Sequence, residues 1–125
     1  MSEKIYANGI KENFELLNNN EQFKEKFKEE QFKILMNPTD EEHAALVIVD
    51  KGTIKVEKVK NKPEENISKD VLGWDGSIQT TRALFNDINS GKAKPGKLIL
   101  KRKLKVQNLK VMAKLSTIQS LLKRD

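Results

Sequence analysis

The sequence predicts an α+β fold: an open, mostly antiparallel sheet of about five strands with helices gathered on one face. Apolar residues recur at three- and four-residue intervals near both ends of the chain, a spacing typical of helices with one buried face. Between them, short alternating or continuous apolar segments predict strands, and Asp50-Lys51-Gly52 joins two of these as a hairpin. With 125 residues, 37% of them hydrophobic, residues 1–125 are expected to form one domain that buries roughly two thirds of its extended-chain surface.

The N-terminal part of the chain predicts two helices. Apolar residues over 5–17 form one stripe at helical spacing, and Asn18-Asn19-Asn20 ends that helix because asparagine favours turns. A second, shorter helix begins at about Asn20. Phe23 and Phe27 stand four residues apart on its apolar face, so we expect both rings in the core.

Three strands are predicted in the middle of the chain, and a shorter one after them. Alternation over 32–36 indicates a half-buried strand. The segment Ala44–Val49 is apolar at every position, so both of its faces should be covered and it should lie inside the sheet. Residues 53–59 alternate and are expected nearer an edge. A polar loop over 60–69 then leads to a short strand over 70–74.

The C-terminal part predicts a helix, a strand and a second helix. An apolar stripe over 78–89 follows Ser77, a favourable N-cap, and Gly91 is expected to end this helix in a left-handed conformation. Alternation over 98–106 predicts a strand. Residues 109–122 again show one apolar stripe and predict the last helix.

The net charge of +6 is distributed unevenly along the chain. Residues 1–50 hold 6 Lys against 11 acidic residues, a net of −5, whereas residues 51–125 hold 18 basic residues against 7 acidic ones, a net of +11. Either the second half meets an anionic partner, or its lysines only solvate exposed positions. A nucleic acid is the less favoured anion, because no aromatic residue stands between Lys92 and Lys114 to stack on bases.

Residues for catalysis or metal binding are few. The chain has no cysteine, and its only histidine, His43, follows three consecutive acids, Asp40 to Glu42, that are expected to be solvated on a turn. We therefore predict no catalytic residues, no metal site, no cofactor and no enzymatic activity. No apolar run is long enough to span a bilayer and no signal-peptide core opens the sequence, which favours a cytoplasmic protein.

The C-terminal part resembles the sterol carrier protein family in the order and spacing of several short motifs over 70–122. They are Ser90-Gly91-Lys92, Pro95, Lys103-Leu104-Lys105-Val106, Asn108 and Lys114-Leu115. The chain departs from the family pattern at two positions. Arg102 stands where the family usually has a small residue, often glycine, and Gln107 stands where a glycine usually precedes the asparagine.

The resemblance implies an elongated apolar cavity between the sheet and its covering helices. It also implies a non-enzymatic domain that binds, and transfers, an apolar lipid such as a sterol, a fatty acyl chain, an isoprenoid or a phospholipid. The alternatives are a nucleic-acid-binding module and an accessory domain of an enzyme. The residues expected to line the cavity are Leu84, Phe85, Ile88, Leu98, Leu100, Arg102, Leu104, Met112, Leu115 and Ile118.

The predicted strand over 98–106 has two faces of different character. Arg102 has the parity of its core-facing positions. In one interpretation, a β-bulge, or extension of the long side chain past the edge of the sheet, exposes the guanidinium to water. In the other, the guanidinium lies at the cavity wall and binds the carboxylate or phosphate of a lipid. The lysines of the opposite face are expected to contact an anionic membrane surface, and they are Lys97, Lys101, Lys103 and Lys105.

Overall fold

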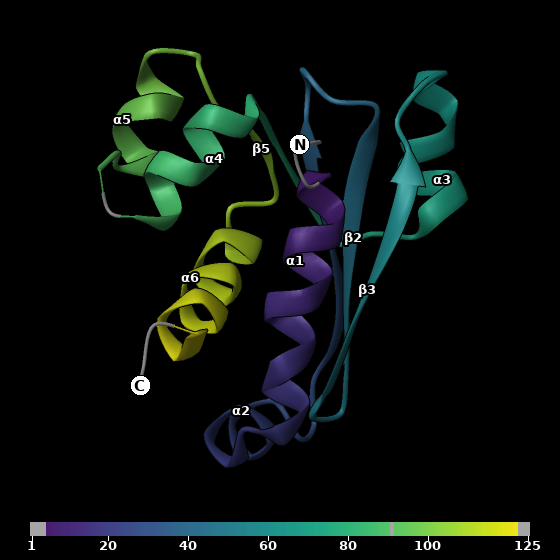
Figure 1. The fold of residues 1–125 in the computed structure, drawn as a ribbon, viewed down its shortest axis with the longest axis vertical. Helices are drawn as coiled ribbons and strands as arrows, with labels where there is room; N and C mark the ends of the chain where they lie inside the picture. Colours follow the sequence, from purple (N-terminus) through teal and green to yellow (C-terminus); the bar gives the residue numbers. More distant parts are fainter. Residues whose placement is uncertain (1–4, 91, 123–125) are drawn as a thin grey trace.

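The computed structural model describes residues 5–90 and 92–122 and shows a five-stranded mixed sheet in the order β3-β2-β1-β4-β5 (Figure 1). β1 and β4 pair in parallel, and the other neighbouring strands pair antiparallel. The predicted fold class is therefore confirmed. The strands are β1 (Gln31–Pro38), β2 (His43–Asp50), β3 (Thr53–Lys60), β4 (Gly76–Thr80) and β5 (Lys105–Gln107).

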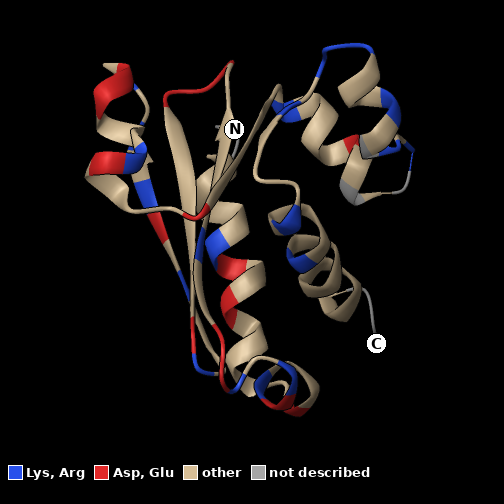
Figure 2. Ribbon diagram, turned by 180° about the vertical axis from the view of Figure 1, so that it is seen from behind, with Lys and Arg blue, Asp and Glu red and all other residues tan. Residues whose placement is uncertain are grey.

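The helices form a thick layer on one face of the sheet and a thin one on the other (Figures 1 and 2). The thick layer comprises α1 (Tyr6–Phe14), the 3₁₀ helix η1 (Glu15–Asn19), α2 (Glu21–Lys26), α4 (Arg82–Asn89), α5 (Pro95–Leu100) and α6 (Lys110–Leu122). The thin layer comprises the 3₁₀ helix η2 (Glu64–Ile67) and α3 (Lys69–Leu72).

The main core lies between the sheet and the thick helical layer. Side chains at alternate positions of β1 and β2 enter it, as the period of a strand requires. Phe23 and Phe27 of α2 are buried there with ring centroids 5.1 Å apart, which confirms the core position predicted for both.

A second, smaller core covers the opposite face of β1 and β2. Leu46 and Leu35 contribute to it together with Ile67 and Trp74, whose indole N–H donates to the carbonyl of Ile67 at 2.9 Å. β2 is thus covered on both faces and lies between β1 and β3, as the continuous apolar run of Ala44–Val49 predicts.

The strand predicted over 70–74 is wrong, because α3 occupies most of this segment. The Ser68 side chain accepts a hydrogen bond from the N–H of Val71 and starts the helix. Gly73 ends it at φ +68°, a left-handed conformation that glycine adopts without steric cost.

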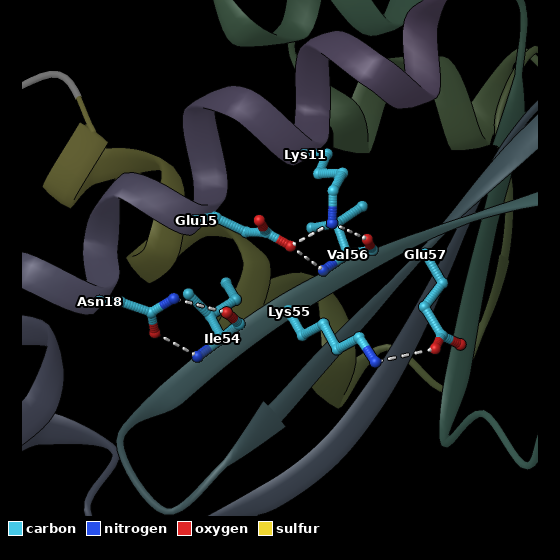
Figure 3. A network of polar contacts seen from close by, with 7 residues as sticks. All are labelled: Lys11, Glu15, Asn18, Ile54, Lys55, Val56 and Glu57. Atoms are coloured by element: carbon cyan, nitrogen blue, oxygen red, sulfur yellow. Dashed lines mark hydrogen bonds and ion pairs between the residues drawn. The ribbon is translucent and has the colours of Figure 1, made fainter.

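The predicted edge strand β3 is confirmed, and side chains from α1 and η1 close its outer edge (Figure 3). Asn18 accepts from the N–H of Ile54 at 2.8 Å and donates to its carbonyl at 2.9 Å. Glu15 accepts from the N–H of Val56 at 2.9 Å, and Lys11 donates to the Val56 carbonyl at 3.2 Å. These bonds occupy backbone groups that would otherwise be free to pair with another strand.

The helix predicted to follow Ser77 begins four residues later than expected. Residues 76–80 form β4 and pair with β1, so Ile78 enters the core from a strand and Ser77 does not cap a helix. Thr81 is the actual N-cap of α4, accepting from the N–H of Leu84 at 3.3 Å. Gly91 lies outside the described residues.

The strand predicted over 98–106 is also wrong over most of its length. Residues 95–100 form α5, with Pro95 in the first turn, where its fixed φ suits a helix. Arg102 then adopts φ +58° in the turn that follows, and only residues 105–107 join the sheet, as β5. The alternation of this segment therefore does not reflect two faces of one strand.

Candidate functional site

An apolar cavity of about 220 Å³ lies between β4, α4 and α6. It is the candidate site on the helical side of the sheet. Its apolar wall consists of Ile78 from β4, Phe85 and Ile88 from α4, and Met112 and Leu115 from α6. Polar side chains border it along α6, and they are Ser116, Gln119 and Ser120.

The position of α6 depends on Gly76. The first turn of α6 packs directly on this residue, so that a Cβ atom added to Gly76 would lie 2.3 Å from Cγ2 of Val111. Val111, Leu115 and Ile118 then follow at helical spacing and are buried, and Met112 is half-buried beside them. The close contact at one end fixes the helix that forms one wall of the cavity.

Polar contacts hold the N-terminus of α4, the opposite wall. The N–H of Arg82 donates to a carboxylate oxygen of Asp40 at 2.9 Å, and its guanidinium donates to Glu41 at 2.6 Å. Glu41 also accepts from the N–H of Tyr6 at 3.1 Å. The acidic turn after β1, predicted to be solvated charge, therefore holds the first turns of α1 and α4.

Tyr6 joins the cavity wall to the main core. Its ring stacks on Phe85 with centroids 5.1 Å apart and an interplanar angle of 23°. The hydroxyl is buried and has no hydrogen-bond partner among the described residues. Burial, which disfavours the phenolate, raises the pKa of Tyr6 well above its usual value of about 10.

The structure brings together four of the residues predicted to line a cavity, namely Phe85, Ile88, Met112 and Leu115. Others take part in the packed core instead of the cavity wall. These are Leu98, Leu104 and Ile118, which are buried, and Leu84, which is half-buried. Contact of any of these residues with a ligand stays a prediction.

Two predicted site residues lie on the surface. The side chain of Leu100 is 85% exposed at the end of α5, and that of Arg102 is exposed in the next turn. The core parity assigned to Arg102 is wrong, because the backbone there is a left-handed turn rather than an extended strand. Of the two alternatives, the structure shows the guanidinium in water.

The four lysines predicted to share one strand face belong to different elements. Lys97 is on α5, Lys101 and Lys103 are in the turn after it, and Lys105 is on β5. All four are exposed. The prediction that they share one face was wrong, although three of the four are neighbours around α5.

Ile78 was missing from the predicted cavity residues, and it reaches the cavity from β4 instead of from the helix predicted for its segment. Its pairing with Met36 across the parallel β1–β4 ladder is a contact distant in sequence, which no local spacing indicates. Ser116 and Gln119 were also missed. Their spacing from Met112 and Leu115 along α6 is the signal that would have included them.

The cavity is lined by apolar side chains and a few uncharged polar ones. Among the residues that the structure describes, no ionisable side chain lines it. In the described ranges, 5–90 and 92–122, no group of three or more His, Cys, Asp or Glu is placed to hold a metal ion. No helix within these ranges is long and apolar enough to cross a membrane. The volume is below the range of about 300–1,000 Å³ usual for ligand pockets.

No protein-family model matches the sequence, and no curated protein matches it either. Solved structures do. Sterol carrier protein 2 from Yarrowia lipolytica, in its apo form, matches with a TM-score of 0.65 and 21% identity over 100% of both chains. The ubiquinone synthesis protein UbiJ-SCP2 matches with a TM-score of 0.60 and 11% identity over 98% of both chains. The chain has the sterol carrier protein 2 fold.

The same fold occurs as part of a larger enzyme. The sec-alkylsulfatase Pisa1 from a Pseudomonas species matches 82% of this chain with a TM-score of 0.60 and 14% identity. The chain spans only 14% of that enzyme's length. At these identities the comparisons establish the sterol carrier protein 2 fold, and the ligand has to be inferred from the cavity.

Proposed function

We propose that the protein binds an apolar lipid in the cavity between β4, α4 and α6, without catalysing a reaction on it. The supporting observation is a cavity with an apolar wall formed by β4, α4 and α6. It lies in a fold that is similar to that of sterol carrier protein 2. Each buried methylene contributes about 0.8 kcal/mol, so a long chain binds without any specific hydrogen bond. A sterol, a fatty acyl chain, an isoprenoid or a phospholipid satisfies this chemistry.

Entry of a whole lipid would widen the cavity. α4 is only eight residues long, and Leu84 and Ile88 on it are half-buried. Its N-terminus is held by Asp40 and Glu41, so the C-terminal turn, which carries Ile88, is the end that would move. The polar side chains of Ser116 and Ser120 on α6 would then border the headgroup end of the ligand.

Native mass spectrometry with lipid extraction, on protein purified from its own organism, would identify the ligand. Uptake of a fluorescent fatty acid and of a fluorescent sterol by delipidated protein would test the cavity directly. Met112→Trp fills the cavity and should reduce uptake at least tenfold. Leu109→Trp is the matched control, because Leu109 is 66% exposed just before the same helix. No co-purifying lipid, together with equal uptake by both variants, would overturn the proposal.

The basic surface around α5 supports a further part of this proposal, contact with an anionic membrane. No acidic residue stands between Asp87 and Asp125. Lys97, Lys101 and Lys103 are exposed beside the 85% exposed Leu100, and basic residues mark this end of the molecule in Figure 2. Each lysine near an anionic surface contributes about 1 kcal/mol, and insertion of an apolar side chain adds to this.

Two triple variants of equal charge would test the membrane contact. Replacing Lys97, Lys101 and Lys103 by Gln should abolish most binding to phosphatidylglycerol vesicles. Replacing Lys24, Lys26 and Lys28 on and beside α2 removes the same charge from the other end of the molecule and should have little effect. Equal binding to neutral and anionic vesicles, or equal loss in both variants, would contradict docking through α5.

A further inference from the structure

A second cavity, of about 490 Å³, lies on the sheet face opposite the apolar cavity. Gln79 of β4 and Lys105 and Gln107 of β5 form its floor, on the opposite side of their strands from Ile78 and Val106. The loop from Asn61 to Lys69 and the ring of Trp74 form its wall. Its volume is within the range usual for small-molecule sites. We call it the polar basin.

Positive charge gathers at the polar basin from three separate elements. Lys62 follows β3, Lys69 is on α3 and Lys105 is on β5, and all three side chains are exposed at the rim. Glu64 is the one acid among the described residues that line the basin. Three ammonium groups around one concave space favour an anion and are available to donate hydrogen bonds to it.

Two buried asparagines lie at the inner end of the basin. Asn37 and Asn61 are 6% and 5% exposed, and Nδ2 of Asn61 donates to Oδ1 of Asn37 at 2.8 Å. The same Nδ2 donates to the backbone carbonyl of Glu41 at 2.8 Å, which fixes the orientation of the amide. Oδ1 of Asn61 is left buried without a partner among the described residues, although such groups are normally satisfied.

We infer that the polar basin binds a small anionic polyol, of the class of sugar phosphates. The three lysines bind the phosphate, and a ligand hydroxyl at the inner end donates to Oδ1 of Asn61. Trp74 presents an apolar wall to the carbon skeleton, and the amides of Gln79 and Gln107 bind further hydroxyl groups. This site is separated from the lipid cavity by the sheet and does not depend on the proposed lipid binding.

Trp74 is the only tryptophan of the chain and lines the polar basin, so its fluorescence reports on binding at this site. We expect saturable fluorescence changes with glucose 6-phosphate, inorganic phosphate and glucose, with the affinity decreasing in that order. Glucose 6-phosphate should bind at least tenfold more tightly than inorganic phosphate or glucose. The phosphate probe measures the contribution of the lysines, and glucose measures that of the hydroxyl contacts.

Lys69→Gln combined with Lys105→Gln should weaken glucose 6-phosphate binding at least tenfold. Lys24→Gln combined with Lys26→Gln removes equal charge on α2, at the opposite end of the molecule from α3 (Figure 1), and should leave the affinity unchanged. Both double variants change exposed side chains, and circular dichroism verifies that each remains folded. No saturable fluorescence change with glucose 6-phosphate, or equal weakening in both double variants, would overturn the inference.

Discussion

The two edges of the sheet differ in how they are held. At one edge, β3 is eight residues long and side chains from α1 and η1 bind its outward backbone groups (Figure 3). At the other edge, β5 is three residues long and the helices beside it enclose a cavity. The β3 side is therefore tightly closed, whereas the β5 side leaves internal volume that a ligand would fill.

Side-chain burial differs between the two sides at some positions. Phe23 and Phe27 are almost completely buried on the closed side. Of the apolar residues that line the cavity, Ile88 and Met112 are only half-buried, whereas Ile78, Phe85 and Leu115 are buried. Atoms that border a void lose part of their dispersion contacts, so these side chains contribute less to stability than packed ones of similar size. We therefore expect the closed side to contribute more to the free energy of unfolding than the cavity side.

Matched truncations on the two sides should give the largest difference in the free energy of unfolding. Phe23→Ala should lower the free energy of unfolding by about 3–5 kcal/mol, because it opens a cavity in a close-packed core. Met112→Ala only enlarges an existing cavity and should cost about 1 kcal/mol. Urea unfolding followed by circular dichroism measures both. Equal losses would show that the two sides are packed alike.

Gly76 is the exception on the cavity side, since α6 packs on it without space. Gly76→Ala should cost about 1–3 kcal/mol, because the new Cβ atom displaces Val111 and the start of α6. Gly96→Ala is the control: a Cβ atom there meets nothing within 4 Å, and alanine favours the α5 helix. The control should leave stability unchanged or raise it by up to about 1 kcal/mol. A neutral Gly76→Ala would mean that α6 moves freely.

The sequence predicted the closed side much better than the cavity side. The hairpin of β2 and β3 depends on Lys51 and Gly52, both at positive φ, and on a continuous apolar strand, so local chemistry determines it. β4 depends on parallel pairing with β1, a contact between distant segments that periodicity does not reveal. That is why Ser77, an acceptable cap by its residue type, proved to be part of a strand.

The prediction for the region around α5 was wrong for a different reason. Leu98, Ile99 and Leu100 form a short apolar run, which fits a strand or a helical turn equally well. Pro95 in the first turn was the signal for a helix. The family resemblance places a small residue, often glycine, at the position of Arg102, and glycine suits the left-handed φ found there. Phe85, Ile88, Met112 and Leu115 line the cavity, and the helices predicted for them were right.

The bonds at the β3 edge should respond to acid. Although partial burial opposes ionisation, hydrogen bonds from Lys11 and the N–H of Val56, with the nearby lysine charges, hold the pKa of Glu15 below its usual value of about 4.5. Such a lowered pKa stabilises the fold above pH 4.5, and this contribution is lost as the pH falls through the folded value.

Glu15→Gln should therefore lower stability by about 1 kcal/mol at pH 7, with the difference from wild type shrinking below pH 4.5. Unfolding midpoints between pH 3 and pH 7 test this. Glu29→Gln, at an exposed position before β1, should show no such convergence. A constant difference between Glu15→Gln and wild type at every pH would mean that the carboxylate charge does not secure the edge.

Tyr6 lies where the two sides meet, since it belongs to α1 and stacks on Phe85 of the cavity wall. Tyr6→Phe should leave the free energy of unfolding unchanged or raise it by up to about 1 kcal/mol. The substitution keeps the ring and removes a buried hydroxyl that has no partner among the described residues. Tyr6→Leu, which removes the stacking as well, is the destabilising control.

The same substitution should also change the response to alkali. Burial raises the folded pKa of Tyr6, so wild type loses stability as the pH rises above about 10, where the unfolded phenol ionises. Tyr6→Phe should lack this loss, and because the chain has one tyrosine, its absorbance follows the ionisation directly. A phenol that titrates near pH 10 in the folded protein would show that water reaches it. In that case α1 and α4 separate readily, and the closed side would not extend to the cavity wall.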